Sequence, residues 1–226
     1  MVWPFTPPLV VLVHMPKAGG TTLSEIMHAV YGYRLLVANP PDGWRQAWTT
    51  ELRTEIWAKR RYWRAFSGHT AYGIHTLFAR PAVYLSSVRD PMERFESYYG
   101  FIRRSREHHY HQMARALGIG EFYRYQRDTG NVELYNFQCQ LICGRKDFAT
   151  AREYAETRYS AIAPLSMFRP AVDWIRRHMG WPDGPVAHLN RTIEKAGVDD
   201  LTEADRRELL RGNQADADLV KLCEDL

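Results

Sequence analysis

The stretch LVVLVHMPKAGGTTL, residues 9–23, decides the fold class of this chain. Its first six residues, 9–14, are an almost continuous run of valine and leucine, which is typical of a central parallel strand covered on both faces. Two adjacent glycines follow. Apolar residues then recur at helical spacing, and a glycine supplies the end signal: Leu23, Ile26, Met27, Val30 and Gly32. The order strand, glycine loop, helix over 22–30 predicts an α/β protein.

The loop between this strand and this helix has the chemistry of an anion site. A helix N-terminus offers unpaired backbone N–H groups and the positive end of the helix dipole, which bind phosphate. Gly19 and Gly20 allow close approach, Thr21 and Thr22 add hydroxyl donors, and Lys17 adds a charge. The order differs from that of an ATP-type P-loop, in which lysine follows the glycines and precedes the hydroxyl residue that holds Mg²⁺. An ordinary glycine turn before a helix is the alternative.

A second segment, SSVRDPMERFESYY at residues 86–99, repeats the strand-to-helix arrangement. Residues 81–90 predict a buried strand, and Asp90 is a natural N-cap for the helix that Pro91 begins. Arg89 then lies at the carboxyl end of a parallel strand, where open α/β sheets bind ligands. Ser97 follows two turns along the helix, on the face that Arg94 shares. Arg89 and Ser97 could bind a second phosphate; the alternative is a structural pair of Arg89 with Asp90 and a solvent-facing Ser97.

Taken together, the two segments resemble the PAPS-dependent sulfotransferases, and most closely the glycan branch of heparan sulfate and uronyl 2-O-sulfotransferases. The resemblance implies a P-loop-like, three-layer α/β/α fold with a central parallel sheet and a largely helical C-terminal half. It implies 3′-phosphoadenosine 5′-phosphosulfate (PAPS) as donor, 3′-phosphoadenosine 5′-phosphate (PAP) as product and no metal. By resemblance, the 5′-phosphosulfate is held by Lys17, Ala18, Gly19, Gly20, Thr21 and Thr22, and the 3′-phosphate by Arg89 and Ser97.

The stretch FSGHTAYGIH, residues 66–75, is similar to the part of the 2-O-sulfotransferases that carries the catalytic base, and His69 matches that histidine. An alcohol must lose its proton as the sulfuryl group is transferred, and histidine titrates near the working pH. Ser67 occupies the position where those enzymes often carry a second histidine. His75 is the rival candidate for the base.

Later motifs match less closely. LYNFQCQLICG, residues 134–144, is similar to the family's Asn-x-Gln helix, which we expect to be structural and near the acceptor cleft. HLNRT, residues 188–192, resembles the loop that closes over the cofactor, which makes Arg191 and Thr192 candidates for cofactor binding. The HHYH run at 108–111 matches no familiar zinc spacing and reads as a polar helical face or as part of the acceptor site.

The rest of the chain predicts one domain over residues 1–226 with mostly helical structure after residue 106. The acid-rich tail from Asp199 reads as a solvated helical face. Further helices are expected at 51–64, 91–106, 107–117, 121–127, 132–143, 147–158, 168–179 and 202–211, with short strands ending at His69 and spanning 159–164.

Composition limits the partners. The net charge of +4 and the pI of about 9.0 favour an acidic ligand, and no nucleic-acid motif is present. The 3 cysteines form no disulfide framework, so we expect a reducing, cytoplasmic location. The apolar N-terminal run is too short to span a membrane.

The sequence therefore predicts an enzyme that moves a sulfuryl group from PAPS to a hydroxyl, most simply on a saccharide, with His69 as base and Lys17 stabilising the leaving phosphate. One alternative is a P-loop kinase that uses ATP and Mg²⁺. The other is a non-catalytic protein that binds acidic glycans or nucleic acid. The acceptor, the position sulfated and the oligomeric state stay open.

Overall fold

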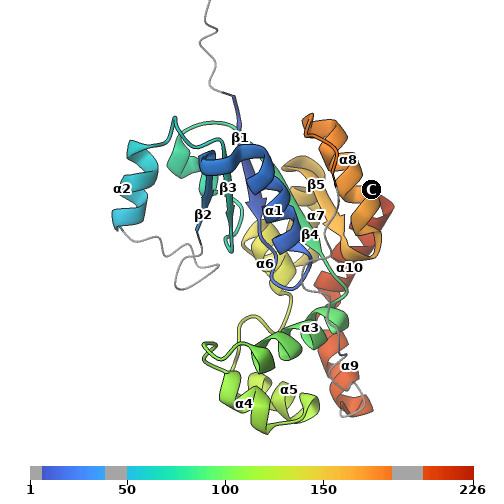
Figure 1. Cartoon of the computed structure of the whole chain (residues 1–226). Coiled ribbons are helices and arrows are strands. Elements are labelled where there is room, and N and C mark those ends of the chain that lie inside the picture. The colour runs from blue at the N-terminus through green and yellow to red at the C-terminus, as the bar shows by residue number, and fades with distance from the viewer. Residues whose placement is uncertain (1–6, 39–49, 185–200) are drawn as a thin grey trace, which may run out of the picture.

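A five-stranded parallel sheet lies at the centre of the structure, a computed structural model that describes residues 7–38, 50–184 and 201–226 (Figure 1). The strands follow the order β2-β3-β1-β4-β5, so that the first strand of the sequence is also the middle one. This confirms the predicted central parallel sheet. The strands are β1 Leu9–Val13, β2 Leu35–Val37, β3 Ala65–Gly68, β4 Ala82–Val88 and β5 Tyr159–Pro164.

Strand β1 is buried along its whole length because both of its faces are covered. Val10 and Leu12 pack with α1 (Gly20–Tyr31) and α8 (Phe168–Met179) on one face of the sheet. Val11 and Val13 pack on the other face, where α6 (Phe137–Cys143), α7 (Phe148–Thr157) and α10 (Gln214–Asp225) complete the third layer. The three-layer α/β/α fold expected from the resemblance is therefore confirmed.

Four helices form a separate cluster, the helical lobe, below the sheet in Figure 1. They bury their own apolar core, which includes Phe95, Ile102, Phe122 and Leu209. The lobe consists of α3 Pro91–Arg104, α4 His111–Ala116, α5 Ile119–Asp128 and α9 Glu203–Gly212.

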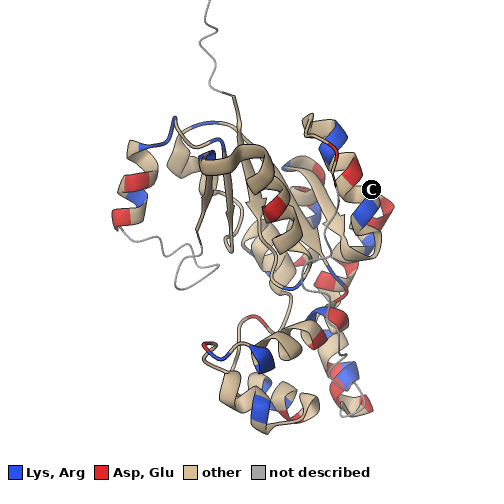
Figure 2. Ribbon diagram, viewed as in Figure 1, with Lys and Arg blue, Asp and Glu red and all other residues tan. Residues whose placement is uncertain are grey.

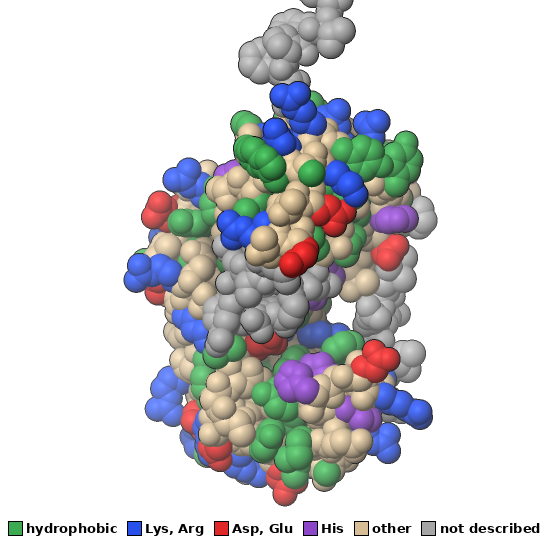
Figure 3. Space-filling model, turned by 90° about the vertical axis from the view of Figure 1, so that its left-hand side faces the viewer, with side chains coloured by type: hydrophobic (Ala, Val, Ile, Leu, Met, Phe, Trp, Pro, Cys, Tyr) green, Lys and Arg blue, Asp and Glu red, His purple; other side chains and the backbone are tan. Residues whose placement is uncertain are grey.

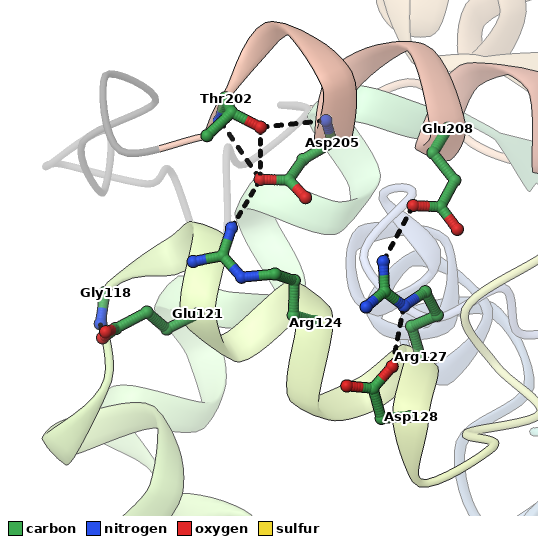
Figure 4. Close-up of polar contacts among 8 residues, drawn as sticks. All are labelled: Gly118, Glu121, Arg124, Arg127, Asp128, Thr202, Asp205 and Glu208. Carbon is green, nitrogen blue, oxygen red and sulfur yellow. Dashed lines mark hydrogen bonds and ion pairs between the residues drawn. The ribbon is translucent and has the colours of Figure 1, made fainter.

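Polar contacts fasten α9 to α5 within the lobe (Figure 4). Asp205 caps its own helix together with Thr202 and also accepts a hydrogen bond of 2.6 Å from Nη1 of Arg124. Arg127 contacts Glu208 at 3.0 Å one turn further along. The late segment of the chain thereby returns to helices formed eighty residues earlier.

Several predicted boundaries were wrong for identifiable reasons. The helix expected at 51–64 is α2 (Thr50–Ala58), which ends before the turn at residues 59–62. The helix expected at 132–143 begins only at Phe137, because Asn136 adopts a left-handed backbone conformation with φ of 47°. The helix expected at 107–117 is only α4, because His108, His109 and Tyr110 form a turn before it. Short one-turn helices, not predicted, lie at Gly32–Arg34, Ile74–Phe78 and Leu165–Met167.

The acidic C-terminal segment carries both exposed charged residues and two buried carboxylates. Basic and acidic residues are interspersed along α9 (Figure 2), as expected for a solvated face, whereas the charged residues of α10 are acidic apart from Lys221. Asp205 and Asp216, however, are buried, with exposures of 5% and 0%. The expectation of a purely solvated helical face is wrong at these two carboxylates, because each accepts hydrogen bonds from another element.

All three cysteines are buried free thiols. For Cys139 and Cys143 this agrees with the prediction, made from their spacing, that they are not bridged to each other. In the described residues, no helix combines the length and the apolar character needed to cross a bilayer.

Candidate active site

The sheet brings the predicted site segments together at the carboxyl ends of three neighbouring strands. His69 follows β3, the glycine loop follows β1, and Arg89 follows β4. The register aligns Val13, the last residue of β1, with Gly68 on one side and Ser86 on the other. Segments that lie seventy residues apart in the sequence therefore share one edge of the sheet, the edge where open α/β folds bind ligands.

The glycine loop is tightly packed. Helix α1 begins at Gly20, and its N-cap Gly19 has a left-handed backbone with φ of 88°. A Cβ atom on Gly20 would lie 2.2 Å from the His14 ring, and one on Gly19 would lie 2.8 Å from Phe168 of α8. Only glycine fits at either position. His14 and Phe168 can therefore pack directly against the loop, which leads into the N-terminus of α1, the kind of helix end that binds anions.

Lys17 also has a left-handed backbone, with φ of 66°. Its Nζ atom lies over the ring of Phe101 from α3, 4.2 Å from the ring centroid. Burial, followed by the charges of Arg104 and Arg89, lowers the pKa of Lys17 from 10.5 to about 8. A buried ammonium group near two guanidinium groups forms a site that an anion would stabilise.

Arg89 contacts the glycine loop directly. Its Nη1 atom donates to the carbonyl of Lys17 at 3.3 Å, and its Nε atom pairs with Glu93 at 3.2 Å. The alternative of a structural pair with Asp90 is wrong, because Asp90 instead accepts from the backbone N–H of Glu93 as the N-cap of α3.

Ser97 and Arg94 occupy the buried face of α3, with exposures of 6% and 4%. The alternative of a solvent-facing Ser97 is therefore wrong. Arg94 points towards α6, where its Nη2 atom donates to the carbonyl of Glu133 at 2.7 Å and its guanidinium lies over the Phe137 ring. Arg94 thus holds the lobe against the third layer.

His69 lies within hydrogen-bonding distance of the main chain of β1. Its Nδ1 atom is 2.8 Å from the carbonyl oxygen of His14. A carbonyl only accepts, so Nδ1 carries the hydrogen in the neutral ring and Nε2 carries the lone pair. Burial lowers the pKa of His69, and the hydrogen bond to His14 partly opposes that shift. The ring is accordingly neutral at pH 7, in the form a base requires.

His14 is a site residue that the sequence reasoning missed. Its ring centroid lies 4.6 Å from that of His69, and the same ring closes against Gly20. Burial, then the neighbouring His69 and Lys17, lowers the pKa of His14 to about 3. A second histidine thus lies beside His69, from the residue that follows β1, while Ser67 donates to Ser24 of α1 at 3.0 Å. The position of His14, directly before the loop, was the available signal.

The rival histidine, His75, lies in the one-turn helix Ile74–Phe78 after β3. Its Nδ1 atom is 2.8 Å from the hydroxyl of Tyr84, which also accepts from the backbone N–H of Gly73. Tyr84 pairs in register with Val11, two residues before the end of β1. His75 is therefore bonded to the middle of the sheet, away from the segments at its carboxyl edge.

A hollow separates the sheet layers from the helical lobe, and histidine side chains border it on the lobe side (Figure 3). The histidines of the lobe are His108, His109 and His111. The rings of His108 and His109 stack at 4.6 Å, and His108 packs edge-on to Phe101, the residue under Lys17. Within residues 7–38, 50–184 and 201–226, no group of three His, Cys, Asp or Glu side chains is arranged to hold a metal ion.

The other predicted binding residues that the structure describes lie in the glycine loop and the first turn of α1. Ala18 is buried in the loop, Thr22 is buried in the first turn of α1, and Thr21 beside it is half-buried. Arg191 and Thr192 lie outside the described residues.

No known family model and no curated protein matches the chain. Solved structures do match its fold. Mouse sulfotransferase SULT7A1, crystallised with PAP, is similar over 98% of this chain and 90% of its own, with a TM-score of 0.52 and 12% identity. A sulfotransferase from Alicyclobacillus acidocaldarius is similar over 95% of this chain and 94% of its own, with a TM-score of 0.51 and 14% identity. The chain therefore has the fold found in these sulfotransferases.

Proposed function

We propose that this protein is a PAPS-dependent sulfotransferase that moves a sulfuryl group to a hydroxyl of an acceptor. The observation that carries the proposal is the hydrogen bond from Arg89 to the carbonyl of Lys17, at 3.3 Å. It places two cationic segments from neighbouring strand ends side by side, within reach of one ligand that carries two phosphates. The shared fold with sulfotransferases supports the same conclusion.

The residues present fit such a donor. The segment Lys17, Ala18, Gly19, Gly20, Thr21 and Thr22 would hold the 5′-phosphosulfate, because it carries the Lys17 charge and forms the N-terminus of α1, where helices attract anions. Arg89 and Ser97 would hold the 3′-phosphate. Arg191 and Thr192 are proposed to close over the nucleotide by the resemblance of their motif alone.

In the proposed reaction, the acceptor oxygen forms a bond to sulfur as the bond from sulfur to the bridging oxygen of the donor breaks. His69 would take the acceptor proton at Nε2, since Nδ1 already donates to the carbonyl of His14 at 2.8 Å. Lys17 would stabilise the negative charge that the leaving phosphate gains. Catalysis would then depend on positioning and electrostatics, as in phosphoryl transfer.

The acceptor is proposed to be a saccharide. The Nζ atom of Lys17 lies over the aromatic ring of Phe101, and His108, whose ring stacks on that of His109, packs edge-on to Phe101. Flat rings with polar nitrogens at their edges suit a ligand with both apolar faces and hydroxyl groups. The match of His69 to the 2-O-sulfotransferase motif favours the glycan branch. Free buried thiols favour a reducing, cytoplasmic location.

The test is a transfer assay with PAPS labelled in its sulfate, against pooled saccharides, lipids and phenols. We expect label in the saccharide pool, and a loss of turnover of roughly 10²-fold or more in Lys17→Ala and His69→Ala. Full activity of His69→Ala with the labelled acceptor would remove the base assignment. Phosphate transfer from ATP that requires Mg²⁺, without sulfate transfer, would instead establish a kinase.

A further inference from the structure

We propose that Gln138 and Asp216 are positioning residues for Arg89, so that the C-terminal helix α10 sets the subsite for the nucleotide's 3′-phosphate. This inference rests on the proposed function. Neither residue belongs to the glycine loop or to α3, and each acts through the backbone of the next element.

Gln138 makes two hydrogen bonds to the backbone of Arg89. The backbone N–H of Arg89 donates to Oε1 of Gln138 at 2.9 Å, and Nε2 of Gln138 donates to the carbonyl of Arg89 at 2.8 Å. Arg89 lies just past Val88, where the pairing of β4 with β5 ends. The amide of Gln138 thus continues the pairing by one residue and fixes the backbone from which the Arg89 side chain extends.

Asp216 in turn holds Gln138 in place. Gln138 is fully buried in the first turn of α6. The carboxylate of Asp216 accepts from the backbone N–H of Gln138 at 3.0 Å and from that of Cys139 at 2.8 Å. These are N–H groups that the first turn of a helix leaves unpaired, and α6 has no side-chain cap of its own. Asp216 therefore serves as the N-terminal cap of α6 from a distant part of the sequence.

Two further hydrogen bonds join the start of α10 to the start of α6. Asn136, in its left-handed conformation, donates its backbone N–H to Oδ1 of Asn213 at 2.9 Å. Its side chain accepts from the backbone N–H of Asp216 at 3.2 Å. The start of α10 and the start of α6 are thereby bonded in both directions, so a shift of α10 would be transmitted to Gln138.

The variants that test this inference are Gln138→Met, which keeps the length of the side chain but removes both amide contacts, and Asp216→Asn, which keeps the size. Gln140→Met is the matched control, because Gln140 lies on the same helix and its amide bonds instead to the carbonyl of Gly144 at 2.7 Å. Each protein is titrated calorimetrically with PAP and with adenosine 5′-phosphate, which lacks the 3′-phosphate.

We expect wild type and Gln140→Met to prefer PAP equally. In Gln138→Met the affinity for PAP should fall by roughly tenfold or more, while the affinity for adenosine 5′-phosphate should change less than about twofold. In Asp216→Asn the preference for PAP should fall in the same direction. Loss of both affinities in parallel, or an unchanged preference in both variants, would overturn the inference. A wild-type protein with no preference for PAP would instead overturn the proposed function, and if Gln138→Met fails to fold, Asp216→Asn decides.

Discussion

The charge of Lys17 depends on pH within the range in which enzymes are assayed. Its pKa, lowered to about 8 by burial and two arginines, means that the free protein loses this ammonium charge in mildly alkaline solution. We predict that the affinity for PAP falls about tenfold between pH 7.5 and pH 9, following the charged fraction of Lys17. Calorimetric titration across that range measures it. Lys17→Arg should remove the dependence, since arginine stays charged; an identical profile in both proteins would contradict the assignment.

We predict that the buried His14 makes the protein less stable in acid. The unfolded chain protonates His14 near its ordinary pKa of 6.5, whereas the folded protein does so only near the lowered pKa of about 3. The unfolded state therefore binds more protons between these values, and the free energy of unfolding falls as the pH falls from 6.5. At pH 5 this single group should cost about 2 kcal/mol.

Urea denaturation of wild type and His14→Gln at pH 7.5 and pH 5 tests this prediction. The glutamine variant should lose less stability between the two pH values than wild type does. Equal losses would show that His14 is not the group that resists protonation.

At the scale of one residue, sequence reasoning identified side chains by chemistry and missed those defined by contact. Lys17, Gly20 and Arg89 stand in recognisable motifs at strand ends. His14 has an equally specific contact with His69, but that contact depends on which strands become neighbours. Its place directly before the glycine loop was the one local signal. The motif that contains Gln138 was expected to be structural, but its bonds to the backbone of Arg89 were not predicted.

At the scale of the element, the glycine loop with the start of α1 makes a definite prediction. The Cβ atom of Gly20→Ala would lie 2.2 Å from the His14 ring, which is confined by His69. We expect this substitution to cost roughly 1–3 kcal/mol of stability and to weaken PAP binding more than tenfold. Gly100→Ala in α3 is the control, because its Cβ would meet only the flexible end of Arg104, at 3.3 Å. Denaturation and PAP titration of both variants measure the effect; equal behaviour would contradict it.

Elements with strong local signals were predicted well. The run at 9–14 gave β1, and Asp90 with Pro91 gave the start of α3. Strand β2 was missed because it has only three residues, too short for a periodic pattern. The tail that forms α10 was expected to be a solvated helical face, so its buried residues Leu219, Val220 and Cys223 were not predicted.

At the scale of the whole molecule, the contacts of Figure 4 fasten the late segment of the chain to the helical lobe. Asp205 is buried, caps α9 through Thr202 and pairs with Arg124 at 2.6 Å. We predict that Asp205→Ala lowers the free energy of unfolding by about 1–2 kcal/mol, because a cap and a partly buried pair are lost together.

A double-mutant cycle with Arg124→Ala separates the pair from the cap. Their coupling should be at most about 1 kcal/mol and should weaken in high salt, because the Arg124 side chain is partly exposed. A coupling of zero would place the whole effect of Asp205 in the cap.

The arrangement of the sheet and its covering helices was predicted before the structure was known, whereas the position of the helical lobe was not. Glycine loops, buried strands and amphipathic helices in alternation predicted an α/β protein with parallel strands, and the three layers were expected from the family resemblance. The lobe is held together and placed by contacts between distant segments: Asp205 with Arg124 within it, and Arg94 with the carbonyl of Glu133, just before α6. Such pairs form only after the chain has folded back on itself.

The central claim is that cationic segments at two neighbouring strand ends bind both phosphates of one nucleotide. The most direct test is a calorimetric titration of the wild-type protein with PAP without added metal, in parallel with ATP and Mg²⁺. We predict binding of one PAP per chain, at least about 10²-fold tighter than ATP, and lost in both Lys17→Ala and Arg89→Ala. Absence of heat with PAP, or tighter binding of ATP with Mg²⁺, would contradict the claim.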